Sequence, residues 1–454
     1  MVDPRDEIRY AGRVRTAVER FGRRCALHAL SGTPFLALLL IGDFAFAAEA
    51  GIPDFKHLGV ASCATSVCHG KLAPQPNKNV ALNEYRTWVT DDRHAQAYRT
   101  LELAESKRIA ANLGLASAAT AKICLDCHAD NIPADKRGPR FQLSDGVGCE
   151  GCHGGAEKWI ESHAAESATH KDNLTRGMYP SEQPLKRAEL CLSCHLGTRD
   201  RFATHAIMGA GHPRLSFELE SYTANQPAHY TVDADYAQRK GKIEGVNLWM
   251  TGQIESIRRS LTLLQTNMFQ PGGMFPEFAF YDCHSCHHPM DKIRWNTQRA
   301  GAGIKPGTLR LQTQNLIVMQ AITETLEPAA LPELVSMTTA LIRAGQRDVA
   351  SVNSAAKALL DWLGRRDAWS KRQFSRAEVV NLRKALINYA ANDKAGDYAA
   401  AEQVVLGAES LSYFLGDRNA KKASLDALYN AVKDDLTFSP SQFLTVAKNA
   451  QRSF

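Results

Sequence analysis

Several classes of protein are excluded by what this 454-residue chain lacks. After residue 50 it has no apolar run long enough to cross a membrane, so we expect no stable membrane span. It has no cluster of basic and aromatic residues, which argues against nucleic-acid binding. It shows no convincing alternation of apolar and polar residues, so we expect a mainly α-helical fold. Residues 305–454 contain neither cysteine nor histidine, and both types therefore concentrate earlier in the chain.

Ten of the eleven cysteines fall in five short motifs, each ending in Cys-His. Four motifs have the form Cys-x-x-Cys-His, and the first has four residues between its cysteines instead of two. The residues are Cys63, Cys68 and His69; Cys124, Cys127 and His128; Cys149, Cys152 and His153; Cys191, Cys194 and His195; and Cys283, Cys286 and His287. The remaining cysteine, Cys25, precedes all of them.

This pattern is typical of covalent haem attachment. Two thiols add to the vinyl groups of the porphyrin, and the adjacent histidine ligates the iron. A zinc site does not require a histidine after every second cysteine, and a disulfide framework does not space its cysteines as five tight pairs. For the widened motif the alternative is a single thioether through Cys68 with Cys63 left free. We favour full attachment, because a free thiol is reactive in an exported protein. The sequence thus predicts five haem c groups.

Residues 1–47 have the features of a cleavable signal peptide. Arginines precede the apolar run at 35–41, and Ala45-Phe-Ala47 offers a small-x-small cleavage site. The alternative is an uncleaved interfacial anchor. Haem attachment of this type occurs outside the cytoplasmic membrane, so we expect a periplasmic protein.

The formal charge of +6 is not evidence for a basic partner. The segment up to Ala47 holds seven arginines and five acidic residues, so its removal lowers the charge by two. Five haems with their propionates bring the mature protein to about −1 to −6, depending on oxidation state.

The motifs divide the chain into an expected pentahaem cytochrome domain at 48–300 and an α-helical domain at 305–454. A polar, glycine-rich stretch at 299–307 is typical of a linker. The first of these domains has long irregular segments, so we expect the haems themselves to form its core.

Apolar residues recur at helical spacing between about 247 and 265. In the C-terminal part we expect about six helices. The signals are a cap at Thr308, a capping box at Ser375–Glu378, a helix from Asp397 ended by Gly416, and helices at 422–436 and 440–451.

Electron transfer favours iron with both axial positions filled, whereas an open position admits a substrate. Outside the motifs and the predicted signal peptide, nine histidines are available for five positions, so the supply does not force a vacancy. They are His57, His94, His163, His170, His205, His212, His229, His284 and His288, with Met178 and Met208 as further candidates. His288 directly follows His287 and cannot reach the opposite face of the same iron; it ligates a neighbouring haem or bonds a propionate.

The segment from 60 to 200 resembles a known family in the order of its motifs. It contains Cys63…His69, Trp88…His94-Ala-Gln-Ala, Gly146-Val-Gly-Cys-Glu-Gly-Cys-His-Gly154 and Cys191-x-x-Cys-His-Leu196. This order is similar to that of the tetrahaem cytochromes of the c-554 type, which accept electrons from hydroxylamine oxidoreductase. The widened first motif, the fifth motif and the helical C-terminal part depart from that family.

The resemblance implies a set of distal ligands. His94 would serve the haem of the 191–195 motif, and His163 the haem on Cys149 and Cys152. The haem on Cys124 and Cys127 would have an open face. The first haem would take a ligand from the stretch 205–217. Four histidines could instead close every position in this chain: His205, His212, His229 and His288.

Two functions follow as hypotheses. The first is a periplasmic electron-transfer protein that carries electrons through five haems between redox partners such as a quinol dehydrogenase, other cytochromes or a reductase. The alternative is a multihaem oxidoreductase acting on a small nitrogen or sulfur compound at an open haem, against which stands the lack of a Cys-x-x-Cys-Lys motif. The C-terminal helices are either a surface for a homo-oligomer or complex, or a stabilising appendage.

Overall fold

The computed structural model describes residues 55–75, 80–242, 244–270, 272, 276–288, 304–305 and 307–454. The predicted signal peptide and most of the predicted linker lie outside these residues. The described part is built from helices and three isolated β-bridges, so the prediction of a mainly α fold is confirmed. None of the helices described is long and apolar enough to cross a membrane.

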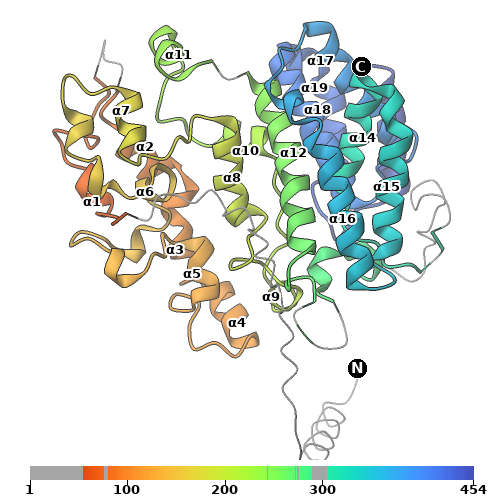
Figure 1. The fold of residues 1–454 in the computed structure, drawn as a ribbon, viewed down its shortest axis with the longest axis horizontal. Helices are drawn as coiled ribbons and strands as arrows, with labels where there is room; N and C mark the ends of the chain where they lie inside the picture. The colour runs from red at the N-terminus through yellow and green to blue at the C-terminus, as the bar shows by residue number, and fades with distance from the viewer. Residues whose placement is uncertain are drawn as a thin grey trace, which may run out of the picture. The chain divides into compact units, whose positions relative to one another are not determined.

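Short helices separated by irregular segments form the part of the chain that carries the motifs (Figure 1). Most have fewer than ten residues. They are α1 Val60–Cys63, α2 Glu84–Asp91, α3 Ala97–Thr100, α4 Ala104–Asn112, α5 Lys122–His128, α6 Cys149–His153, α7 His170–Thr175, α8 Pro184–His195, α9 His205–Gly209, α10 Leu219–Asn225 and α11 Ala234–Lys240, with the 3-10 turns η2 Arg93–Gln96, η7 Phe278–Phe280 and η8 Cys283–Ser285.

Longer helices form the rest. They are α12 Gly245–Leu264, α14 Gln314–Leu326, α15 Leu331–Ala344, α16 Val349–Gly364, α17 Arg376–Ala391, α18 Tyr398–Leu415, α19 Arg418–Val432 and α20 Pro440–Gln451. Their apolar faces form one continuous core that includes Trp249, Ile322, Leu386 and Leu411, all almost fully buried. Helix α12 packs against α8 and α10 on one side and against α14, α16 and α18 on the other. It therefore connects the region of the motifs to the C-terminal helices.

Most of the expected helix signals are confirmed. The helix expected at 247–265 is α12, and 440–451 is α20. Ser375 and Glu378 form the capping box of α17, in which each side chain accepts the backbone N–H of the other residue. Asp397 caps α18 through the N–H of Ala400, and Gly416 ends that helix at a φ of 68°, which favours glycine. The helix expected from residue 422 begins earlier, at Arg418.

The predicted cap at Thr308 is wrong, because α14 begins only at Gln314. The intervening residues form an extended bridge to the chain ahead of the fifth motif instead. The N–H of Asp282 donates to Arg310 O at 2.8 Å, and the N–H of Gln312 donates to Phe280 O at 2.8 Å. These bonds satisfy backbone groups that a helix would otherwise pair locally. The C-terminal part has seven described α-helices, one more than expected.

Candidate functional site

The motifs lie where the backbone gathers their side chains on one face. Motif 3, Cys149–His153, forms α6 itself, and motifs 2 and 4 end α5 and α8. In a helix, residues three and four positions apart are neighbours on the surface, so the two cysteines and the histidine of a plain motif come together. All ten motif cysteines carry free thiols. This is the arrangement that two thioether bonds and one axial ligand require.

The widened first motif closes in the same way as the fifth. In the fifth motif the N–H of His287 donates to Cys283 O at 2.8 Å. In the first the N–H of His69 donates to Cys63 O at 3.1 Å, although two more residues intervene. The chain turns tightly there: a Cβ on Gly70 would lie 1.9 Å from Ala64 O. The two extra residues therefore form a loop. The backbone hydrogen bond between the histidine and the first cysteine is the same in both motifs.

Each motif histidine faces one histidine from elsewhere in the chain. The ring centres of every pair lie 6.1–6.3 Å apart, whereas the angle between the two ring planes varies. The pairs are His69 with His163 (6.2 Å, 12°), His128 with His212 (6.3 Å, 85°), His153 with His229 (6.1 Å, 83°), His195 with His94 (6.2 Å, 89°) and His287 with His205 (6.2 Å, 36°).

This separation fits one metal ion between two imidazoles. A metal–nitrogen bond of about 2 Å, with about 1.1 Å more from the nitrogen to the ring centre on each side, places the two ring centres about 6.2 Å apart. Rings that packed directly on each other would lie closer. Five pairs thus share the separation expected of axial ligands on opposite faces of an iron, and the residues present fit haem c at all five motifs.

Hydrogen bonds at Nδ1 orient several of these rings. The acceptors are a carboxylate for His69 (Glu84, 2.9 Å) and His94 (Asp92, 2.8 Å), and a backbone carbonyl oxygen for His128 (Ala97, 3.1 Å), His163 (Ile160, 2.6 Å) and His212 (Pro213, 2.7 Å). With the proton on Nδ1, Nε2 keeps its lone pair for a metal. Partners of this type commonly hold metal-binding histidines in place.

The electrostatics of the rings favour the neutral imidazole that binds iron. Burial lowers the pKa of His153 to about 3 and that of His195 to about 4. Burial also lowers the pKa of His163 and His229. His69 and His94 are the opposite case, because the hydrogen bonds to Glu84 and Asp92 raise their pKa values and so increase the basicity of these ligands.

The pairing differs from the resemblance-based ligand set in three places. His163 faces His69 in the first motif rather than His153, which faces His229. The second motif, expected to have an open face, has His212 opposite His128. The stretch 205–217 supplies the second and fifth motifs rather than the first. The assignment of His94 to the 191–195 motif agrees with the ring geometry.

The structure distinguishes two of the candidate histidines, His229 and His288. His229 is one of the nine candidates and one of the four histidines expected to be able to close every position. No local pattern distinguishes it, and only the count of five vacant positions could have pointed to it. His288 is another of those four, but the ring opposite His287 is that of His205. The other non-motif histidines have polar partners: His57 bonds Asp130 (2.6 Å), and His170 bonds Glu182 (2.9 Å).

Thiols of different motifs lie next to each other. Cys63 shares a hydrogen bond with Cys149, and Cys127 with Cys194. The hydrogen bond from Cys127, with help from Arg201, lowers the pKa of Cys194 to about 5. Because thioether bonds form at the edge of a porphyrin, haems held by motifs 1 and 3 would meet at their edges, and so would haems held by motifs 2 and 4.

Cysteine pairs that add haem and histidine pairs that enclose its iron are the donor set of a c-type cytochrome. A family comparison supports this class: residues 62–154, about a fifth of the chain, match the model of the family described as cytochrome c554 and c-prime. The match supports a c-type cytochrome with covalently bound haem, iron and a role in electron transfer. No curated protein and no solved structure matches the chain.

Proposed function

We propose that this protein is a periplasmic electron carrier with five haem c groups, each held by two thioether bonds and two histidines. The haems supply one-electron Fe(III)/Fe(II) chemistry, and the chain positions and insulates them. One observation carries the proposal: each of the five motif histidines faces a second histidine at the separation that an iron requires. With every axial position filled, iron changes little on reduction, which suits electron transfer.

The contacts between motifs suggest an order of transfer. Motif 1 meets motif 3 through Cys63 and Cys149, and motif 2 meets motif 4 through Cys127 and Cys194. Cys152 of motif 3 is electrostatically coupled to Cys191 of motif 4. The fifth haem joins through α9, whose first residue is His205 and which is followed by His212 of the second site. The resulting order is 1–3–4–2–5, with haems 1 and 5 at the ends.

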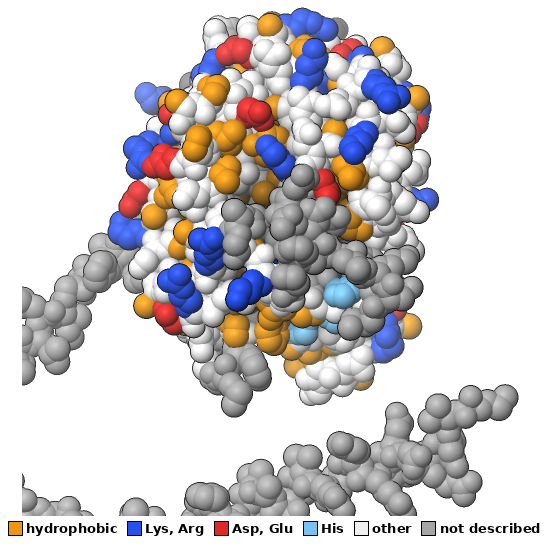
Figure 2. All heavy atoms as spheres, turned by 90° about the vertical axis from the view of Figure 1, so that its right-hand side faces the viewer, with side chains coloured by type: hydrophobic (Ala, Val, Ile, Leu, Met, Phe, Trp, Pro, Cys, Tyr) orange, Lys and Arg blue, Asp and Glu red, His pale blue; other side chains and the backbone are white. Residues whose placement is uncertain are grey.

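The oxidoreductase alternative requires an open iron, and none of the five described motif histidines lacks an opposing ring. Catalysis would therefore require one histidine to leave. The redox partners remain a prediction, namely a quinol dehydrogenase, another cytochrome or a reductase. The proposal includes no nucleic-acid partner; on the one face seen in Figure 2, lysines and arginines are interspersed with apolar and acidic side chains.

The ring angles give a sharp test. Ferric haem with nearly parallel axial imidazoles gives a rhombic low-spin resonance, whereas perpendicular planes give a signal with one very large g value. We therefore expect two haems of the first kind, from the pairs at 12° and 36°, and three of the second kind, at 83–89°. The measurement is electron paramagnetic resonance of the oxidised mature protein, quantified against total haem by optical spectroscopy.

A high-spin signal equal to one haem in five would contradict the proposal and favour the oxidoreductase. Replacement of a distal histidine supplies the positive control. His212→Ala should convert one perpendicular site to high spin and leave the other four unchanged. His170→Ala, which removes a histidine outside the pairs that bonds Glu182, should leave all five low-spin.

A further inference from the structure

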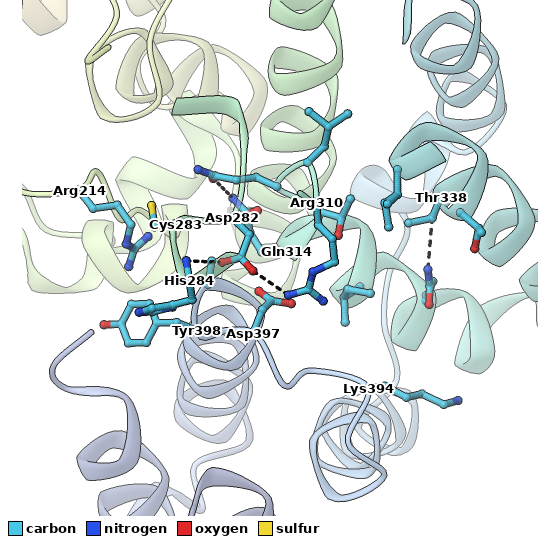
Figure 3. A pocket seen from close by; sticks show the side chains of 18 of the residues that line it. Arg214, Asp282, Cys283, His284, Arg310, Gln314, Thr338, Lys394, Asp397 and Tyr398 are labelled. Carbon is cyan, nitrogen blue, oxygen red and sulfur yellow. Dashed lines mark hydrogen bonds and ion pairs between the residues drawn. The ribbon is translucent and has the colours of Figure 1, made fainter. Parts of the chain in front are cut away.

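A cavity of about 200 Å³ lies beside the fifth motif, between that motif and the C-terminal helices. Cys283 and His284 line it from the motif, and Arg310 and Asp397 line it from the helical region (Figure 3). This volume can hold on the order of six water molecules, at about 30 Å³ each. The matched family segment, residues 62–154, ends before both the fourth and the fifth motif.

Two carboxylates in this cavity share one guanidinium group. Figure 3 shows Asp282 and Asp397 both pointing toward Arg310, and the Asp282 carboxylate accepts from Arg310 at 2.7 Å. The cluster carries a net charge of −1 when both acids are ionised. Two carboxylates this close, with a single cation between them, favour binding of one proton.

The proton belongs on Asp397 rather than on Asp282. Asp282 also accepts the N–H of His284 (3.1 Å) and the hydroxyl of Ser285 (3.3 Å), and these donors stabilise its charged form. Asp397 accepts the N–H of Ala400 at 2.8 Å. Burial, and next the charge of Asp282, raise the pKa of Asp397 against the opposing effect of Arg310.

Other charged groups around the cavity are engaged elsewhere. Arg214 bonds Glu402 (2.9 Å) and lies over the ring of Tyr398, and Lys394 lies over the ring of Tyr389. The ring of His284 bonds the backbone carbonyl of Asp435 (3.0 Å). The side chain of Asp435, which follows α19, also lines the cavity and adds negative charge.

We propose that this cavity is a proton-binding site, in which Asp397 takes up one proton when the fifth haem gains one electron. Asp282 directly precedes Cys283, so the acid cluster lies at the thioether edge of that haem. One electron enters from the neighbouring haem or a redox partner, and one proton enters from solvent and binds a carboxylate oxygen of Asp397. On oxidation both leave. The porphyrin carries its propionates on the edge opposite the thioethers, so this site is separate from them.

The inference rests on the proposed fifth haem, so total haem is quantified first in the holoprotein. Redox titration followed by electron paramagnetic resonance between pH 5 and 9 then separates the two sites with nearly parallel rings from the three perpendicular ones. In the wild type, one of the two nearly parallel sites should shift by up to about 59 mV per pH unit, the value for one proton per electron. In Asp397→Asn that site should become independent of pH.

Asp348→Asn is the matched control, because Asp348 caps α16 as Asp397 caps α18 and is not among the residues that line the cavity. It should keep the wild-type slope. Asp397→Ser, also a good N-cap, serves if the asparagine variant does not fold. A slope that persists in both Asp397 variants, a slope on a perpendicular site, or no slope in the wild type would overturn the inference. Fewer than five haems would instead overturn the proposed function.

Discussion

The two regions of this molecule are held together by different means. Among described residues 55–242, the buried apolar side chains form only small clusters, such as the one around Leu101 and Leu125. Helices α12 and α14–α20 share one continuous apolar core. Residues 55–242 contain eight of the ten motif thiols and nine of the ten paired histidine rings, and the second region contains the long helices. Apolar burial can stabilise the second region alone, whereas the first needs the bulk and the covalent bonds of its haems.

The largest effect should come from withholding the haems. A protein with all ten motif cysteines replaced by alanine cannot attach haem. We expect residues 55–242 to lose protection of their backbone amides while α14–α20 keep theirs. Hydrogen exchange followed by mass spectrometry measures this directly, with the holoprotein as the control. Equal protection in both regions would show that apolar burial alone can stabilise the motif region. The contrast between the two regions would then be wrong.

Part of this contrast could be predicted from the sequence, because it depends on local patterns. Motif spacing, the capping box at Ser375 and the C-terminal glycine at 416 act over a few residues. The histidine pairing could not be predicted in the same way. His94 and His195 are a hundred residues apart, and loops without periodicity decide which rings meet. The start of α14 was missed for a related reason, since residues 310–312 pair with the chain before the fifth motif.

A buried carboxylate holds the first and third motifs together. Glu150, inside motif 3, is 3% exposed. Its carboxylate accepts the N–H groups of Leu58 (2.8 Å), Gly59 (2.7 Å) and Ala156 (2.7 Å). Glu150→Ala leaves three buried donors without an acceptor, at about 1–3 kcal/mol each, so we expect a loss of about 3 kcal/mol or more.

Chemical denaturation of the holoprotein, followed at the haem absorbance, measures this loss. The matched control is Glu157→Ala, because Glu157 accepts one N–H, from Lys56, at the longer distance of 3.4 Å near the surface. It should change the stability by less than about 0.5 kcal/mol. Similar losses of stability in both variants would show that the buried carboxylate of Glu150 stabilises the motif region no more than an exposed one does.

A pH effect is expected at α10, which packs against α12 and α18 and so joins the two regions. Burial, and next the charge of Glu218, raise the pKa of Glu220 from 4.5 to about 7. Since the folded state holds this proton more tightly than the unfolded state, its contribution is fully present below pH 4.5 and is lost as the pH rises to about 7. The loss should be about 3 kcal/mol.

Glu220→Gln cannot ionise and should remove that part of the pH dependence. The measurement is the midpoint of thermal unfolding by far-ultraviolet circular dichroism at pH 5 and pH 8, for the variant and the wild type. The difference between these two midpoints should be smaller in the variant. An unchanged difference would mean that Glu220 titrates normally and that the contact between the regions tolerates its charge.

The smallest effect compares the same local motif in the two regions. Thr169 and Asp172 form a capping box at α7, as Ser375 and Glu378 do at α17. Helix α17 buries residues such as Leu386 in the continuous core, whereas α7 has no buried residue. Ser375→Ala should therefore lower the free energy of unfolding of the helical region by about 1 kcal/mol, the usual value of an N-cap. Thr169→Ala should leave global stability unchanged and increase only the local exchange of the α7 amides, since a helix without core contacts can open alone.

Equal effects of the two variants on global unfolding would show that α7 belongs to the same cooperative unit as α17. The haems would then couple the motif region to the helices more tightly than apolar contacts alone can.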